Sequence, residues 1–221
     1  CIQVITVDDS TAPEITCPLD VTIECTDSTN PSNTGIASAT DNCDVNPEID
    51  FADSVEQGTC PQESTITRTW TAIDECGNSS TCIQVITVDD STAPEITCPA
   101  DVTIECTTDI VASTNIADTD TASATDNCDA APAITFGDSV EQGPCPQEST
   151  ITRTWTATDE CDNSSTCIQV ITVDDSTAPE ITCPADVTIE CTDSTDPSNT
   201  DIASATDNCD LDPVITLSDS V

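Results

Sequence analysis

Apolar and polar residues alternate in short runs along this sequence, a pattern typical of β-strands with one buried face. The clearest run is residues 64–73, in which Ile66, Arg68, Trp70 and Ala72 alternate with threonines. No stretch shows helical periodicity. Between residues 14 and 88, the predicted strands are residues 14–17, 21–25, 35–40, 48–52, 64–73 and 81–88. About seven short strands separated by turn residues predict an all-β sandwich.

The strand pattern recurs along the chain, because residues 1–17 reappear unchanged at 82–98 and at 167–183. The interval from Cys106 to Cys128 is longer than its counterpart in the first copy. Each repeat is long enough to be a domain rather than one turn of a solenoid. The predicted division is residues 1–9 (last strand of a preceding repeat), 10–90 (repeat 1), 91–175 (repeat 2) and 176–221 (first part of a truncated repeat 3).

Composition points to an extracellular disulfide framework. The chain has 16 cysteines but no CxxC pair of the kind found in zinc ribbons, so bridges formed in an oxidising compartment are the better interpretation. Neither a signal peptide nor a long apolar span is visible. With 43 acidic and 2 basic residues, the net charge of -41 argues against nucleic acid as a partner and against insertion of this segment into a membrane.

In each of the two complete repeats, the first and last cysteines are predicted to form a disulfide bridge. They are Cys17, Cys25, Cys43, Cys60, Cys76 and Cys82 in the first, and Cys98, Cys106, Cys128, Cys145, Cys161 and Cys167 in the second. A Cys17–Cys82 bridge would join the first and last strands, which are neighbours in immunoglobulin-like sandwiches. It would close a long loop and contribute about 4 kcal/mol on the chain-entropy account. Cys98–Cys167 is its equivalent.

The other four cysteines of a repeat leave two pairings open. Strand direction in such a sandwich favours Cys25–Cys76 at one end and Cys43–Cys60 at the other. The sequential alternative is Cys25–Cys43 with Cys60–Cys76, and spacing alone does not choose between them. Each incomplete repeat, at either end of the chain, contains only one of the two cysteines that form the first-to-last bridge. This predicts that the chain is a piece of a longer protein or a repeating subunit completed by its neighbours.

Three segments carry a resemblance to a known family. They are Ala-Pro-Glu-Ile-Thr-Cys-Pro at 93–99, Thr-Trp-Thr-Ala-Ile-Asp-Glu-Cys-Gly-Asn at 69–78 and Cys-Ile-Gln-Val-Ile-Thr-Val at 82–88. Together they resemble hyalin-repeat (HYR) domains, an immunoglobulin-like family of extracellular and adhesive proteins. The resemblance covers the whole chain and implies tandem immunoglobulin-like (HYR-like) β-sandwich domains.

The family pattern has two cysteines, which Cys17 and Cys82 match, whereas the other four depart from it. The motif Thr-Asp-Asn-Cys-Asp at 40–44 and the extra cysteines are similar to a variant in giant surface adhesins of bacteria. The resemblance implies a secreted or cell-surface protein with an adhesive or filament-forming role and no catalysis.

Calcium is the strongest candidate for specific chemistry. Acidic residues follow the third and last predicted strands, and in a sandwich these strand ends would lie at one pole beside the next repeat. Hard oxygen ligands are what Ca²⁺ requires. The candidate ligands are Asp41, Asp44, Asp89, Asp90, Asp126, Asp129, Asp174 and Asp175. The alternative is a solvated acidic surface. The short linker 90–94 contains a proline, which restricts hinge motion and favours an extended rod.

Other motifs have weaker functional interpretations. Asn78 and Asn163 each begin an Asn-Ser-Ser acceptor pattern for N-glycosylation, although a polar turn is the simpler interpretation. The threonine stripe of residues 64–73 would suit glycan or ice binding, against ordinary β-propensity on an exposed face. Arg68 and Arg153 occupy equivalent positions and are predicted to form ion pairs at a sheet edge.

Catalysis is not expected, because the chain contains no histidine, and its two basic residues are both arginines. The sequence therefore predicts a structural or adhesive stalk whose partners are neighbouring repeats or identical subunits. Ca²⁺ at the joints would stiffen this stalk, and no organic cofactor is expected. Two alternatives remain: a module that binds surface polysaccharide or ice, and a self-assembling fibre subunit joined end to end.

Overall fold

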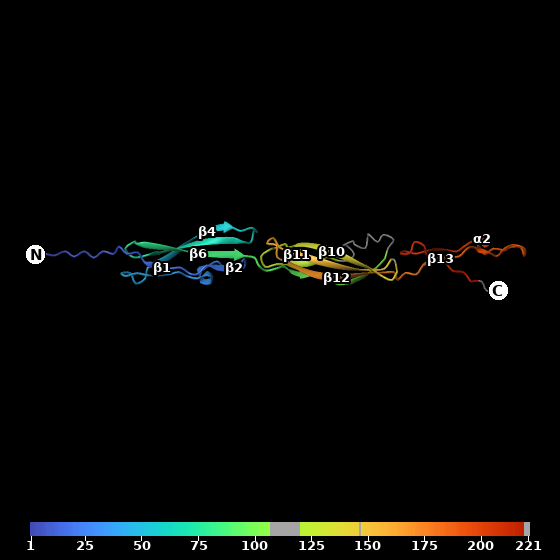
Figure 1. The fold of residues 1–221 in the computed structure, drawn as a ribbon, viewed down its shortest axis with the longest axis horizontal. Helices are drawn as coiled ribbons and strands as arrows, with labels where there is room; N and C mark the ends of the chain where they lie inside the picture. Colours follow the sequence, from blue (N-terminus) through green and yellow to red (C-terminus); the bar gives the residue numbers. More distant parts are fainter. Residues whose placement is uncertain (107–119, 146, 219–221) are drawn as a thin grey trace. The chain divides into compact units, whose positions relative to one another are not determined.

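The protein is described by a computed structural model covering residues 1–106, 120–145 and 147–218. The strands of repeat 1 are β1 (Glu14–Thr16), β2 (Val21–Glu24), β3 (Ser38–Thr40), β4 (Glu48–Gln57), β5 (Ser64–Ile73) and β6 (Ser79–Asp89). β1 pairs with β3, and a four-stranded sheet has the order β2-β6-β5-β4. β1 contacts β5 and β6, so the two sheets pack together (Figure 1). The all-β sandwich predicted from the sequence is confirmed.

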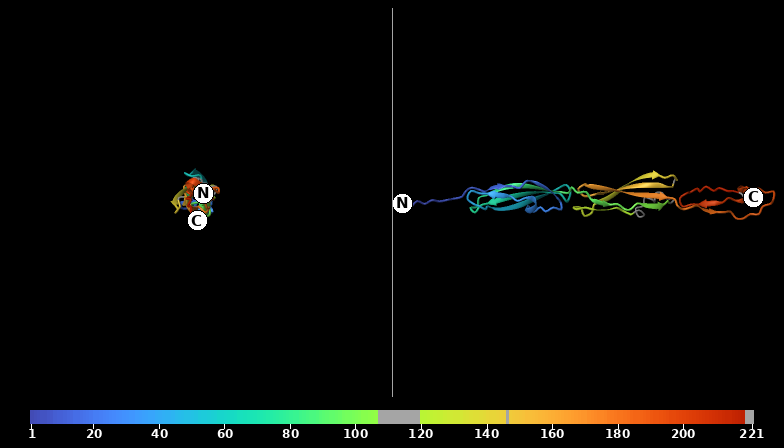
Figure 2. Two further views of the ribbon diagram at one scale, coloured as in Figure 1. Left: turned by 90° about the vertical axis from the view of Figure 1, so that its right-hand side faces the viewer. Right: turned by 90° about the horizontal axis from the view of Figure 1, so that it is seen from below.

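The second repeat has the same arrangement. Its strands are β7 (Glu95–Thr97), β8 (Val102–Glu105), β9 (Ser123–Thr125), β10 (Ala133–Gln142), β11 (Ser149–Thr158) and β12 (Ser164–Asp174). β7 pairs with β9, and the larger sheet has the order β10-β11-β12-β8, whose long strands run alongside one another in Figure 2. β13 (Glu180–Thr182) and β14 (Ser204–Thr206) pair in the C-terminal part. The segment 107–119, in which the longer cysteine interval of repeat 2 falls, lies outside the described residues.

Strand directions determine which ends of the elements meet. β5 is antiparallel to β4 and to β6, whereas β2 runs parallel to β6 with Val21 opposite Ile86 and Glu24 opposite Asp89. The end of β2 therefore lies beside the end of β6. β3 is antiparallel to β1, and its last residue, Thr40, lies opposite Glu14. These two relations place the loops that carry the cysteines and aspartates.

Two differences from the predicted strands have simple causes. The strand expected at 48–52 continues as β4 through Gln57, because it pairs with β5 along its full length. The strand expected at 35–40 is shortened to β3, because one helical turn, α1 (Pro31–Thr34), precedes it. The equivalent turn in the C-terminal part is α2 (Pro197–Thr200). A single turn is too short to produce helical periodicity in the sequence.

The core of repeat 1 combines apolar residues with a buried arginine. Trp70 is 2% exposed, and Arg68 on the same strand face is also 2% exposed. Arg68 donates from Nε and Nη2 to the Asp53 carboxylate at 2.8 and 2.9 Å, and from Nη1 to Thr34 Oγ1 at 2.9 Å. Its guanidinium lies 4.5 Å from the centroid of the Phe51 ring. A buried charge needs this full set of partners to be tolerated.

This arrangement corrects one expectation. The ion pair of Arg68 is present, but β5 is an interior strand between β4 and β6, not a sheet edge. Phe51 is 40% exposed and covers Trp70 and Arg68 from outside. Arg153 repeats the ion pair with Asp138 at 2.8 Å on interior strand β11.

The described chain forms two compact units that differ from the sequence repeats. The first comprises Cys1–Glu95, Ala124–Ala133 and Ala157–Ser165, and the second comprises Ile96–Ser123, Ile134–Thr156 and Thr166–Val221. Two loops of repeat 2 thus belong to the unit that contains repeat 1. Disulfide bridges tie these loops there, as described below.

Candidate metal site and the disulfides around it

First-to-last bridges are present in both complete repeats. Cys17 is bonded to Cys82, and Cys98 to Cys167, with Cα–Cα distances of 5.8 Å in each case. These are the bridges expected from the sequence. They cross between the small and the large sheet of each sandwich, because each begins next to β1 or β7 and ends in β6 or β12.

The remaining bridges connect one repeat to the next. Cys25 is bonded to Cys128 and Cys60 to Cys161, with Cα–Cα distances of 6.0 and 5.2 Å. All four cysteines lie in the first compact unit. Cys106–Cys209, within the second unit, is the equivalent of Cys25–Cys128.

The expected pairing of Cys25 with Cys76 is therefore wrong, as is that of Cys43 with Cys60. The physical reason is the direction of β2. Because β2 runs parallel to β6, Cys25 lies at the end of β6, where its N–H donates to the Asp89 carbonyl at 2.9 Å. Cys76 precedes the start of β6, at the opposite end of that strand. The sequential alternative fails as well, since Cys43 and Cys76 are both free.

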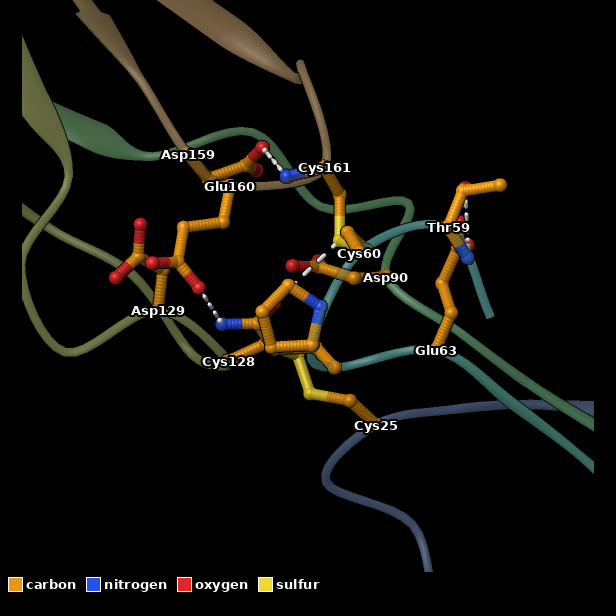
Figure 3. The surroundings of a disulfide bond; sticks show 12 residues. Cys25, Thr59, Cys60, Glu63, Asp90, Cys128, Asp129, Asp159, Glu160 and Cys161 are labelled. Atoms are coloured by element: carbon orange, nitrogen blue, oxygen red, sulfur yellow. Dashed lines mark hydrogen bonds between the residues drawn. A yellow bond between two sulfur atoms is a disulfide. The ribbon is translucent and has the colours of Figure 1, made fainter. Parts of the chain in front are cut away.

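Three aspartates meet between these bridges. One carboxylate oxygen from each of Asp90, Asp126 and Asp159 lies within 4.8 Å of the others. Figure 3 shows Asp90 drawn between the Cys25–Cys128 and Cys60–Cys161 bridges, with Asp159 on the neighbouring loop. We call this cluster the Asp90 site.

Local turns orient two of the three carboxylates of the Asp90 site. Oδ1 of Asp126 accepts the N–H groups of Cys128 and Asp129, both at 2.8 Å, which is the Asx-turn geometry of the Asp-Asn-Cys-Asp motif. Oδ1 of Asp159 accepts the N–H groups of Cys161 and Asn163 at 2.9 and 2.8 Å. In both loops an aspartate is thus fixed two residues before a bridged cysteine.

Two oxygens of the Asp90 site have no hydrogen-bond partner among the described residues. They are Oδ2 of Asp90 and Oδ2 of Asp126, and both are buried. Asp90 is 4% exposed and Asp159 is 6% exposed. Burial raises the pKa of Asp90, and the nearby charges of Asp126 and Asp159 add to this effect. Buried carboxylates that face one another without a cation are costly, and a divalent cation removes that cost.

The donor set fits a hard cation. All three groups offer carboxylate oxygens, as Ca²⁺ prefers, and the two unpartnered oxygens supply free ligand positions. Other oxygens, including water, would complete a shell of about six to eight ligands. The groups that contain cysteine sulfur are different, because their sulfurs are used in disulfides.

Asn163 holds the Asp90 site together. Its Nδ2 donates to the backbone carbonyl of Asp90 at 2.8 Å and to Oδ2 of Asp159 at 3.0 Å. Asn78 makes the same pair of bonds, to the carbonyl of Asp9 at 3.1 Å and to Asp74 at 2.8 Å. The nitrogen that would carry an N-linked sugar is therefore engaged at both positions, which favours the turn interpretation of these motifs.

A second carboxylate cluster has the same composition. Asp9, Asp41 and Asp74 also lie within 4.8 Å of one another, and Oδ2 of Asp41 is buried without a partner. We call this group the Asp9 cluster. Asp9 is half-buried, whereas its equivalent Asp90 is buried. In the C-terminal part, Oδ2 of Asp207 is likewise buried and unpartnered.

The structure regroups the predicted ligands. Asp41 and Asp90 were expected to converge, and this is wrong: Asp41 lies with Asp74 before the start of β6, and Asp90 follows its end. The expectation assigned the ends of β3 and β6 to one pole, but the antiparallel pairing of β3 with β1 places the end of β3 at the other. Asp74 and Asp159 were not among the predicted ligands, although each opens an Asp-Glu-Cys motif that repeats.

The other candidate ligands have different roles. Asp44 accepts the N–H of Glu75 at 3.2 Å, which links two loops, and Asp129 accepts the N–H of Ala131 at 2.8 Å, which stabilises a turn. The remaining candidates, Asp89, Asp174 and Asp175, belong to no all-carboxylate group among the described residues.

Glu24 fixes the linker that follows β6. It accepts the hydroxyls of Thr92 at 2.7 Å and Ser91 at 3.0 Å, which lower its pKa. Glu105 makes the equivalent bonds to Ser176 and Thr177, and these lower its pKa to about 2. Both linkers are therefore hydrogen-bonded to the end of β2 or β8.

The similarity of this chain to known proteins is weak. No protein-family model matches the chain, and no curated protein is similar to it. A solved structure of extracellular cadherin domains 1–4 of protocadherin gamma B7 is similar at 15% identity with a TM-score of 0.28, covering 77% of this chain and 53% of that one. This chain thus spans about half of that structure. Among the described residues, no helix is long and apolar enough to cross a membrane.

Proposed function

We propose that this chain is a segment of an extracellular structural or adhesive stalk, with HYR-like repeats joined by disulfides and by Ca²⁺. The observation that carries the proposal is the Asp90 site, where two buried carboxylate oxygens lack a partner beside a third carboxylate. The site combines the linker after β6 with two loops of the next repeat. A cation bound there would hold the three segments together.

The disulfides support an oxidising location. Five bridges join described cysteines, and such frameworks persist outside the cytosol. Three of them link successive repeats, which suits a load-bearing array, because these cross-links keep the joined segments together when the chain is under tension. We propose no catalytic role, since the chain has neither histidine nor lysine and its arginines serve the cores.

Calcium titration of the oxidised chain tests the proposal. We expect binding by calorimetry, and a melting temperature roughly 10 °C or more higher in Ca²⁺ at 100 times Kd than in chelator. Asp126→Asn keeps the Oδ1 turn bonds but removes the ligand charge, so it should abolish one class of site. Glu14→Gln removes one exposed charge outside both clusters and should bind like the wild type.

A second measurement addresses the stalk itself. We expect small-angle scattering to give a longer maximum dimension, with less spread, in Ca²⁺ than in chelator. Identical binding and melting curves in Ca²⁺ and in chelator would refute the calcium part of the proposal. A collapsed, variable particle in both conditions would refute the stalk.

A further inference from the structure

Cys43 and Cys76 occupy the positions in repeat 1 that Cys128 and Cys161 occupy in repeat 2. Both pairs lie in the same motifs, Thr-Asp-Asn-Cys-Asp and Asp-Glu-Cys. In repeat 2 the two cysteines are bonded to the preceding repeat, whereas in repeat 1 both are free and exposed. We call the surface formed by Asp9 and residues 41–46 and 74–78 the Cys43 pole.

The Cys43 pole already has the geometry of its bonded counterpart. Oδ1 of Asp41 accepts the N–H groups of Cys43 and Asp44 at 2.8 and 2.9 Å, as Asp126 does in repeat 2. Oδ1 of Asp74 accepts the N–H of Cys76 at 2.9 Å, as Asp159 does for its own cysteine. Both thiols are therefore presented from loops of the same form as the bonded ones, with no neighbour required to shape them.

A hollow opens between the two thiols. It has a volume of about 380 Å³ and is lined by Asp9, Cys43, Val45 and Cys76 among others. The hollow separates two thiols whose counterparts in repeat 2 are both bonded to the preceding repeat.

The bonded pole of repeat 2 shows which groups would cover this surface. There, Gln62 donates to Glu160 at 3.1 Å and Asn127 donates to Glu24 at 3.4 Å. Glu75 and Asn42 hold the corresponding positions at the Cys43 pole. The acceptor Glu75 and the donor Asn42 thus match the glutamine and the glutamate that another repeat would bring.

We propose that the Cys43 pole docks the end of another repeat of this type, the end that carries the equivalents of Cys25 and Cys60, and is locked to it by two disulfides. The bridges pair a Cys25 equivalent with Cys43 and a Cys60 equivalent with Cys76. This deepens the proposed stalk function, on which it rests for the presence of a neighbouring repeat. It does not depend on calcium.

Each bridge forms by exchange with a low-molecular-weight disulfide. One protein thiolate attacks that disulfide, forms a mixed disulfide and releases one small thiol. The second protein thiolate attacks the mixed disulfide and releases the other small thiol. Two protein thiols are thereby oxidised to one S–S bond, one small disulfide is reduced to two thiols, and the two protons pass to those thiols. Loss of water around the sulfur, together with the charge of Asp9, raises the pKa of both Cys43 and Cys76.

The internal repetition allows a direct test. Because residues 1–9 are identical to 82–90, a second copy of residues 10–81 placed before Cys1 extends the full chain in register. Each cysteine-containing peptide of the added copy carries one marker substitution, such as Thr26→Ser beside Cys25 and Thr59→Ser beside Cys60, so that its mass differs from that of the original peptide. The extended chain is reduced, refolded in a mixture of reduced and oxidised glutathione, and mapped by mass spectrometry without reduction. We expect the added Cys25 to be linked to Cys43 and the added Cys60 to Cys76, in more than about nine-tenths of the molecules.

Single variants keep the test informative. Cys43→Ser should leave the bridge to Cys76 intact, and Cys76→Ser should leave the bridge to Cys43. A bond between the original Cys43 and Cys76, a bridge from the added Cys25 or Cys60 to another cysteine of the added copy, or a failure of the original Cys43 and Cys76 to react would overturn the proposal. Repeating the map in Ca²⁺ and in chelator separates the two proposals, because bridges formed without any calcium binding would refute the calcium site and leave the docking pole standing.

Discussion

The Asp90 site and the Asp9 cluster are built from the same residues in the same order, yet they differ in cover. At the Asp90 site, two disulfides hold neighbouring segments against the aspartates, and Asp90 is 4% exposed. At the Asp9 cluster, the adjacent cysteines are free and Asp9 is half-buried. The turns that aim the carboxylates are nevertheless alike. Local sequence therefore shapes each cluster, and the neighbouring repeat buries it.

Among the changes that compare the two clusters, removal of a disulfide beside the Asp90 site should have the largest effect on the free energy of unfolding. The double variant Cys60→Ser and Cys161→Ser should lose about 2–4 kcal/mol of unfolding free energy, because the unfolded chain regains loop entropy. The matched variant Cys43→Ser and Cys76→Ser should change stability by less than about 0.5 kcal/mol. Guanidinium unfolding in chelator measures both. Equal losses in the two variants would mean that the poles do not differ in the way described.

Replacing the buried carboxylate of Asp90 should shift the melting temperature in opposite directions with and without calcium. In chelator at pH 7, Asp90→Asn should raise the melting temperature by a few degrees, because it removes an ionised group that burial disfavours. In Ca²⁺ it should lower the melting temperature relative to the wild type, because a ligand is lost. Asp9→Asn, at the less buried position, should show a smaller change in chelator.

Asp90 also makes the stability of the folded protein depend on pH, in a direction that follows from its raised pKa. The folded-state pKa of Asp90 is raised, so the folded protein binds this proton more tightly than the unfolded chain. In chelator, its penalty is complete above the folded pKa and disappears as the pH falls below the ordinary value. The stability advantage of Asp90→Asn should therefore shrink between pH 7 and pH 4. An advantage that stays constant with pH would contradict this origin.

The asparagines that tie each linker offer a milder comparison. Asn163→Ala should cost about 1–2 kcal/mol, since it leaves the Asp90 carbonyl without its donor in a buried site. Asn78→Ala removes the same two bonds beside the more exposed Asp9 and should cost less. Urea unfolding of both variants in chelator gives the two values, and a larger loss for Asn78→Ala would contradict the ranking by burial.

The smallest effect concerns the turns before β5 and β11. The Thr59 hydroxyl donates to Glu63 at 2.9 Å and lowers the pKa of that carboxyl, whereas Pro144 at the equivalent place has no hydroxyl. This contribution to stability is present above the ordinary pKa of Glu63 and is lost as the pH falls through the lowered value. Thr59→Val should raise the pKa of Glu63, as measured by carboxyl NMR titration. An unchanged pKa would show that the hydroxyl is not the cause.

Much of the fold was predictable because alternation depends on local chemistry. The run at 64–73 indicates both the strand and the buried face of β5, including Arg68. The position of Arg68 in the interior of the sheet was not predictable, since it depends on β4 and β6 lying on either side. The Asx turns at Asp41 and Asp126 are local as well, which is why the acidic motif pointed to one aspartate of each carboxylate cluster. Which aspartates share a site depends on the relative direction of β2, β3 and β6, and alternation carries no information about direction.

The repeats, the strand faces, the first-to-last bridges and the turns that present each aspartate and cysteine could be predicted from the sequence, because they depend on neighbours along the chain or on one shared pattern. The bonding of Cys25 and Cys60 to the next repeat, and the enclosure of Asp90 with Asp126 and Asp159, follow instead from tertiary geometry. The parallel pairing of β2 with β6 brings Cys25 to the end of β6, where the following repeat begins. Partners about a hundred residues apart are selected by that geometry, which leaves no periodic trace in the sequence.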